Sequence, residues 1–164
     1  TSVLDVAAET LEQVRELSYR LRPATLEEFG LPVALETLAH DMGDEAGLSV
    51  DYLTDFDGVA LTPEAEVTLY RIAQEAITNV VRHAQAEFLI VELLHSNNGV
   101  QLRIEDDGCG FSPYQAPAQP GQHHMGLISM QERAEIIGGS FELMSAPMRG
   151  TSILVRIPVT GNSR

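Results

Sequence analysis

The 164-residue sequence has a single cysteine and no tryptophan, and aromatic residues make up only 5% of it. One cysteine, Cys109, excludes an internal disulfide and offers no zinc-ligand spacing. No apolar run approaches the length of a membrane-spanning helix, and there is no charged-then-apolar leader. We therefore expect a cytoplasmic fragment in a reducing compartment, without membrane contact of its own.

Basic residues are also scarce. Ten Lys and Arg residues stand against 24 Asp and Glu residues, which gives a net charge of −14. A surface of this sign repels the phosphates of a nucleic acid, so we expect no direct nucleic-acid binding. The length and the 44% hydrophobic content suit one buried core with an appendage.

The most informative stretch is residues 69–84, LYRIAQEAITNVVRHA. At helical periodicity its apolar residues share one side and its polar residues the other. The apolar side holds Leu69, Ala73, Ala76, Ile77, Val80 and Ala84, and the polar side holds Arg71, Glu75, Asn79, Arg82 and His83. Glu75, Asn79 and His83 follow one another at four-residue steps and so face one small volume. Oxygen ligands beside cations suit a Mg²⁺-bound polyphosphate, although a solvated polar face is the simpler alternative.

A second stretch carries complementary chemistry. Residues 100–105 alternate like a strand and lead into Asp106-Asp107-Gly108-Cys109-Gly110. Glycines at alternate positions let the backbone approach a ligand closely, and the acidic residue before them can accept a hydrogen bond from an amino group. Acidic turns with glycine are common between strands, so this motif alone is weak evidence.

In this order and spacing, the two stretches resemble the N box and the first glycine box of the ATP-binding superfamily of sensor histidine kinases, DNA gyrases and heat-shock chaperones of the ninety-kilodalton class. Three further segments are similar to motifs of nitrate-sensor-like histidine kinases or of the superfamily. They are the second glycine box at 124–133, the last glycine motif at Arg149-Gly150-Thr151, and the joining segment at 21–31 that begins Leu-Arg-Pro. The resemblance covers nearly the whole chain.

The resemblance implies a role for each site residue. Asp106 would accept the adenine amino group, Gly108 and Gly110 would let the base and ribose approach, and Thr151 would support the adenine end. Asn79 would be a ligand of Mg²⁺. Glu75 would act beside it as a second metal ligand and as the general base. The remaining nucleotide contacts would be Arg82, His83, Gly126 and Leu127, with phosphate at a helix N-terminus opened by Gly126. Many relatives have lysine in place of Arg82, and a planar guanidinium contacts phosphate differently.

The resemblance also divides the chain. Residues 1–24 would be the second helix of a dimerisation domain, with a heptad seam that includes Leu4, Leu11 and Leu21; an ordinary helix packed on its own domain is the alternative. Residues 25–164 would be the ATP-binding catalytic domain, and the proline-rich segment 112–125 its lid. His40 follows the joining segment, so we expect a solvated surface histidine and no phosphoacceptor. The acceptor helix would be absent from this chain.

We therefore expect an α+β fold: a two-layer sandwich of helices on a mixed, largely antiparallel sheet, with an N-terminal helix. Strands are expected at 48–56, with Val50, Tyr52 and Leu53 turned inward, at 88–94 and 100–105 as a hairpin, and at 141–144 and 153–159. A helix is expected at 126–137.

The implied function is ATP-dependent phosphorylation of a histidine in a two-component phosphorelay. Its partners would be a second copy of the full-length kinase, which can be membrane-anchored through missing segments, and a response regulator with a helix-turn-helix output domain. A serine kinase of the anti-sigma type and a non-catalytic interaction module remain as alternatives. By itself the fragment is expected to bind ATP and Mg²⁺ without phosphorylating itself.

Overall fold

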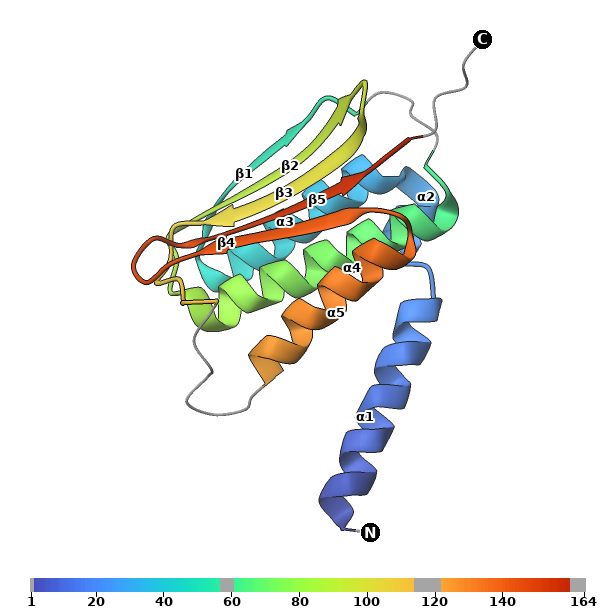
Figure 1. Ribbon diagram of the computed structural model, residues 1–164, viewed down its shortest axis with the longest axis vertical. Coiled ribbons are helices and arrows are strands. Elements are labelled where there is room, and N and C mark those ends of the chain that lie inside the picture. The colour runs from blue at the N-terminus through green and yellow to red at the C-terminus, as the bar shows by residue number, and fades with distance from the viewer. Residues whose placement is uncertain (1, 57–60, 114–121, 160–164) are drawn as a thin grey trace.

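The computed structural model describes residues 2–56, 61–113 and 122–159. A five-stranded sheet in the order β1-β2-β3-β5-β4 forms one layer, and helices cover one of its faces (Figure 1). The strands are β1 (Ser49–Thr54), β2 (Phe88–Ser96), β3 (Gly99–Asp106), β4 (Ser140–Ser145) and β5 (Thr151–Ile157). β1 pairs parallel to β2, and the other pairs are antiparallel. The expected mixed, largely antiparallel two-layer fold is confirmed.

The helical layer is formed by α3 (Leu31–Ala46), α4 (Pro63–Asn79) and α5 (Gln122–Ile136) (Figure 1). Thr62 caps α4, since its side chain accepts a hydrogen bond from the N–H of Ala65, and Pro63 occupies the first turn. The apolar side of α4 packs into the core, where Leu69, Ile72 and Ile77 have no exposed surface. The short helix α2 (Ala24–Phe29) contacts α3.

The alternation of β3 directs one row of its side chains into the core. Leu102 and Ile104 are 1% and 2% exposed, and the next residue in the same row is Asp106, at 6%. A carboxylate is thus carried to the helical face at the end of the strand. The tight link from β2 to β3, which pairs Ser96 with Gly99, confirms the predicted hairpin.

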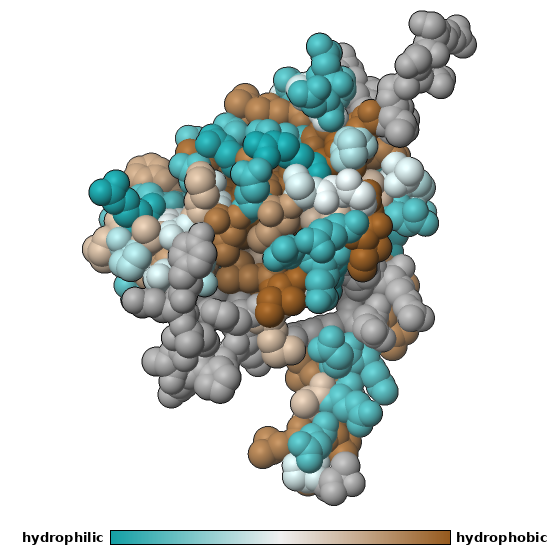
Figure 2. All heavy atoms as spheres, viewed as in Figure 1, coloured by the Kyte–Doolittle hydropathy of each residue, from teal (hydrophilic) through white to brown (hydrophobic). Residues whose placement is uncertain are grey.

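The N-terminal helix α1 (Val3–Arg20) projects away from the sandwich (Figure 1). Ser2 begins it with a capping box, in which its hydroxyl and the Asp5 carboxylate each accept the other residue's backbone N–H. Leu4, Leu11 and Leu21 are more than half exposed, and apolar spheres are visible on this helix in Figure 2. The structure therefore does not show this helix packed on its own domain.

Several predicted boundaries were wrong. The stretch 69–84 is the second part of a helix that begins at Pro63, but its last turn, η1 (Val80–Ala84), is a π-helix and not α-helical. The helix expected to begin at Gly126 begins at Gln122, because glycine alone does not end a helix. The first strand is shorter than expected, and Leu53 is 55% exposed, since it follows Tyr52 on the opposite face. His40 is half-buried in α3 rather than fully solvated. Most of the expected lid, residues 114–121, lies outside the described residues.

Candidate functional site

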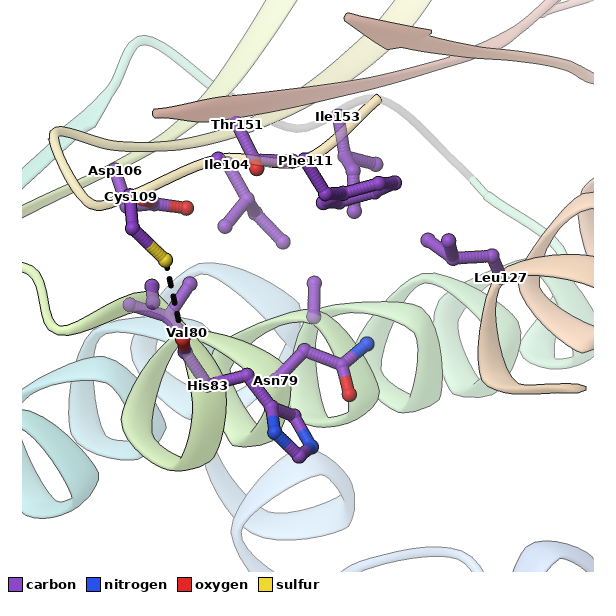
Figure 3. A pocket seen from close by; sticks show the side chains of 13 residues that line it. Asn79, Val80, His83, Ile104, Asp106, Cys109, Phe111, Leu127, Thr151 and Ile153 are labelled. Atoms are coloured by element: carbon purple, nitrogen blue, oxygen red, sulfur yellow. Dashed lines mark hydrogen bonds between the residues drawn. The ribbon is translucent and has the colours of Figure 1, made fainter. Parts of the chain in front are cut away.

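A pocket lies between the sheet and the helical layer, where β3 and β5 meet the end of α4. Side chains enter it from the sheet, from α4 with η1, and from α5 (Figure 3). Six of the predicted site residues line it: Asn79, His83, Asp106, Gly110, Leu127 and Thr151. The structure thus brings together residues that are up to 72 positions apart in the sequence, from 79 to 151.

Asp106 is the buried charged group of this pocket. Its Oδ1 accepts the N–H of Gly108 at 2.8 Å, and Thr151 is its register partner on β5. Burial raises the pKa of the Asp106 carboxyl above its ordinary value, and the N–H of Gly108 partly opposes this rise. A carboxylate held at the end of an apolar strand is suited to accept a hydrogen bond from a ligand's amino group.

The surroundings of Asp106 are mainly apolar. Ala76 and Val80 line the helical side of the pocket, and Ile104 and Ile153 line the sheet side (Figure 3). Leu127 of α5 closes one end. A flat apolar ring with a polar edge fits between these walls, because its faces meet aliphatic side chains while its edge meets the carboxylate.

Asn79 and His83 form the polar side of the pocket, away from the sheet (Figure 3). The Nδ2 of Asn79 is buried and has no hydrogen-bond partner among the described residues. A buried polar atom without a partner is costly, so a ligand that bonds to this carboxamide would offset the cost. The side-chain carboxamide also carries an oxygen of the kind Mg²⁺ prefers.

Glu75 lies beside α5 and does not line the pocket. A Cβ built on Gly126 would lie 2.6 Å from the Oε1 of Glu75, so the carboxylate occupies the space that a larger residue at 126 would fill. Gly126 is the fifth residue of α5 rather than its first, so its amide is inside the helix and not at the free N-terminus.

Gly108 and Gly110 have a packing reason for lacking side chains. A Cβ on Gly108 would lie 2.3 Å from the carbonyl oxygen of Ala84, and one on Gly110 would lie 2.1 Å from that of Ala146. Gly110 also has a φ of +58°, which disfavours other residues. These close backbone approaches hold the end of β3 against η1 and against the turn after β4.

Arg82 is exposed on η1 and does not line the pocket. η1 is a π turn, so its residues do not keep the spacing of an α-helix, although Asn79 and His83 both line the pocket. The carbonyl oxygen of Ala84 accepts the N–H of Cys109 at 2.7 Å, which joins this turn to the glycine motif. The sequence contains no signal that predicts a π turn.

Seven of the lining residues were absent from the predicted site, and Cys109 and Phe111 are two of them. Cys109 lines the pocket and its Sγ lies 3.4 Å from the carbonyl oxygen of His83, to which it can donate (Figure 3). Phe111 lines the pocket just after the glycine motif. The sequence could have predicted Phe111, because it directly follows Gly110 and so lies next to the same pocket.

Within the described ranges, no group of three or more His, Cys, Asp or Glu side chains is arranged to hold a metal ion. The same ranges contain no helix that is long and apolar enough to cross a membrane.

Comparison with protein families finds one model that matches residues 64–161, described as histidine kinase-, DNA gyrase B- and HSP90-like ATPase. The matched range includes every predicted site residue. It begins in the first turn of α4 and ends just after β5.

Curated relatives are sensor kinases. The oxygen sensor histidine kinase NreB of Staphylococcus carnosus is 32% identical over 155 residues, which are 94% of this chain and 44% of the relative. The sensor histidine kinase LiaS of Bacillus subtilis is 36% identical over 154 residues, 94% of this chain and 41% of the relative. The chain therefore spans less than half the length of either relative.

Solved structures with the same fold are histidine kinase domains. Acinetobacter baumannii histidine kinase AdeS superposes with a TM-score of 0.68 at 17% identity, covering 96% of this chain and 81% of that one. The ATP-binding domain of PrrB from Mycobacterium tuberculosis gives a TM-score of 0.58 at 23% identity, covering 78% of this chain and 93% of that one. At these identities, the superpositions show that this chain and the two kinase domains share a fold.

Proposed function

Because the chain belongs to the histidine kinase-, DNA gyrase B- and HSP90-like ATPase family, we propose that it is the catalytic, ATP-binding part of a two-component sensor histidine kinase. It transfers the γ-phosphoryl group of ATP to a histidine on a dimerisation helix absent from this chain. The observation that carries the proposal is the buried Asp106 carboxylate at the end of an apolar pocket whose other side presents Asn79. The named relatives favour this function over an anti-sigma-type serine kinase or a non-catalytic module.

The adenine end of the nucleotide is assigned to the sheet. Asp106 accepts a hydrogen bond from the exocyclic amino group, and Thr151, its register partner, lies beside it. Leu127 and the aliphatic wall contact the faces of the base. Gly108 and Gly110 hold the backbone that carries Asp106 close to the base and ribose.

The phosphate end is assigned to α4 and η1. The Oδ1 of Asn79 would hold a Mg²⁺ ion, and the Nδ2 of the same carboxamide, which is buried without a partner in the described structure, would donate to a phosphate oxygen. When bound, the ion neutralises phosphate charge during transfer. His83, which lines the pocket, and Arg82, which is exposed on the same turn, contact phosphate oxygens.

Glu75 is assigned as the general base, with Asn79 as its neighbour on the same helix. It orients or deprotonates the attacking histidine nitrogen, which forms a bond to the γ-phosphorus as the bond to the ADP oxygen breaks. The phosphorylated histidine then passes its phosphoryl group to a response regulator, for which we propose a helix-turn-helix output domain.

The exposed helix α1 supports the proposed division of the chain. Residues 1–24 are proposed to be part of a dimerisation domain, and residues 25–164 the catalytic domain with its lid at 112–125. The exposed apolar side chains of α1 suit packing against a second copy in the full-length kinase. We propose a cytoplasmic location for this part, in a parent protein that can be anchored in the membrane.

Calorimetric titration with an unhydrolysable ATP analogue tests the proposal, with and without Mg²⁺. The unmodified chain should bind the analogue more tightly with Mg²⁺, and Asp106→Asn should lose binding, because it replaces a charged acceptor. Absence of binding by the unmodified chain, and by a version extended at its N-terminus, would contradict the proposal. Acid-labile phosphate formed on this chain alone would overturn the assignment of the acceptor to another helix.

A further inference from the structure

Ser145 does not line the pocket, yet it contacts three groups around it. At the end of β4, its Oγ accepts the N–H of Phe111 at 2.9 Å. The same Oγ lies 3.1 Å from the carbonyl oxygen of Gly150 and 2.9 Å from the Oγ1 of Thr151. Phe111 and Thr151 both line the pocket, so Ser145 joins two of its walls.

The donors and acceptors around the Ser145 Oγ determine where the hydroxyl protons of Ser145 and Thr151 lie. The N–H of Phe111 can only donate, and the carbonyl oxygen of Gly150 can only accept, so the single Ser145 proton goes to Gly150. All three contacts are then hydrogen bonds only if Thr151 donates to Ser145. The Thr151 proton is thereby committed to Ser145, and the Thr151 oxygen presents only lone pairs to the pocket.

Thr151 stands next to a second acceptor. Ser145, Thr151 and Asp106 are register partners across β4, β5 and β3, so their side chains form one row on the same face of the sheet. An ionised carboxylate has no proton to donate. The sheet end of the pocket therefore offers two neighbouring acceptors, Asp106 and Thr151.

We infer that Ser145 is a positioning residue that fixes Thr151 as an acceptor and so makes the pocket select a base edge with an amino group over one with a carbonyl oxygen. This inference rests on the proposed function, because it takes Asp106 and Thr151 as contacts of the base. An amino group donates to acceptors, whereas a carbonyl oxygen would leave their lone pairs unpaired in a buried site. Without Ser145, the Thr151 hydroxyl can turn and donate to a carbonyl oxygen.

The test compares ATP with inosine triphosphate, which has the same sugar and phosphates but a carbonyl oxygen in place of the amino group. The ratio of their dissociation constants is measured by calorimetry with Mg²⁺. Ser145→Ala should reduce the preference for ATP by about fivefold, the size expected for one hydrogen bond. Ser145→Thr, which keeps the hydroxyl, and Ser140→Ala, at the exposed start of the same strand, should retain the preference.

Thr151→Val is a second test, because it removes the acceptor at 151 while Ser145 is left unsubstituted, and it too should reduce the preference. An unchanged ratio in a folded Ser145→Ala chain, checked by circular dichroism, would overturn the inference. So would an equal loss of both nucleotides, which would mean that Ser145 only supports the fold. If the unmodified chain binds neither nucleotide, the proposed function fails and the inference fails with it; a retained ATP preference with an unchanged ratio refutes the inference alone.

Discussion

At the scale of single residues, two adjacent carboxylates at the end of β3 have opposite environments. Asp106 is 6% exposed and its pKa is raised, mainly by burial. Asp107 is exposed, and its Oδ1 accepts the N–H groups of Glu87 and Phe88, each at 2.9 Å, which lowers the pKa of its carboxyl. The Asp106 carboxylate is therefore held in the pocket at a cost to stability, whereas that of Asp107 fixes the start of β2.

These opposite pKa shifts predict opposite pH dependences. A group with a raised folded pKa contributes stability at low pH and loses it as the pH rises through that pKa, so Asp106→Asn should gain stability relative to the unmodified chain as the pH rises from the acidic range to neutral. Asp107 contributes stability above its unfolded pKa and loses it as the pH falls through its lowered folded pKa. Relative to the unmodified chain, Asp107→Asn should therefore lose stability as the pH rises.

Urea unfolding of the nucleotide-free chain, measured from about pH 3 to pH 8 around the ordinary carboxyl pKa values, checks both signs. Each substitution is the control for the other, because both replace an aspartate by asparagine at neighbouring positions. Parallel pH profiles for the two variants would show that their environments do not differ as the structure indicates.

At the scale of elements, α4 and α5 touch where Glu75 meets Gly126. An alanine at 126 would place its Cβ 2.6 Å from the Oε1 of Glu75, the movable end of a flexible side chain. Gly126→Ala should therefore keep or raise the free energy of unfolding, by up to about 1 kcal/mol, because alanine is favoured over glycine inside a helix. It should also displace the carboxylate and, if Glu75 is the base, slow phosphotransfer about tenfold or more.

Phosphotransfer is measured with an acceptor helix supplied, and thermal unfolding is followed in parallel. The control is Gly126→Ala in a Glu75→Ala background, where it should cause no further loss of rate. A further loss there would mean that Gly126 acts independently of Glu75.

The sequence predicts those parts of the site that depend on the local periodicity of a strand or a helix. Alternation along β3 carries Asp106 inward with Ile104, and helical spacing places Asn79 on the polar side of α4 with Glu75. The π turn at Val80–Ala84 has no such signal, and its hydrogen bond from Cys109 to the Ala84 carbonyl oxygen joins residues that are distant in the sequence. The role of Ser145 depends on β5 lying between β3 and β4, an order that spacing along the chain does not determine.

At the scale of the whole molecule, α1 and the sandwich are joined by a short segment with specific contacts. Arg22 pairs with Glu66 of α4 at 2.5 Å, and Nη2 of Arg71 donates to the carbonyl oxygen of Leu21 at 3.1 Å. Both contacts lie beyond the end of α1. The helix itself leaves its apolar side chains exposed and so contributes little to the stability of the sandwich.

Removal of residues 1–20 should therefore change the free energy of unfolding by less than about 0.5 kcal/mol. Removal of residues 1–23 also deletes the partly exposed Arg22–Glu66 pair and should cost a further ~0.2–1 kcal/mol. Chemical denaturation of the two shortened chains measures both values. A loss of several kcal/mol on removing residues 1–20 alone would show that α1 belongs to the folded unit, contrary to the proposed boundary after residue 24.

The position of β5 has a consequence for how the protein is made. Among the described strands β5 comes last in the sequence, yet it lies between β3 and β4, and Thr151 is its first residue. A chain still on the ribosome can therefore contain Asp106 and Asn79 without having a complete pocket. Nucleotide at a hundred times its dissociation constant stabilises a folded protein by about 2.7 kcal/mol. Cellular ATP would thus protect only chains in which β5 has been synthesised and inserted, and would leave incomplete ones to the proteases.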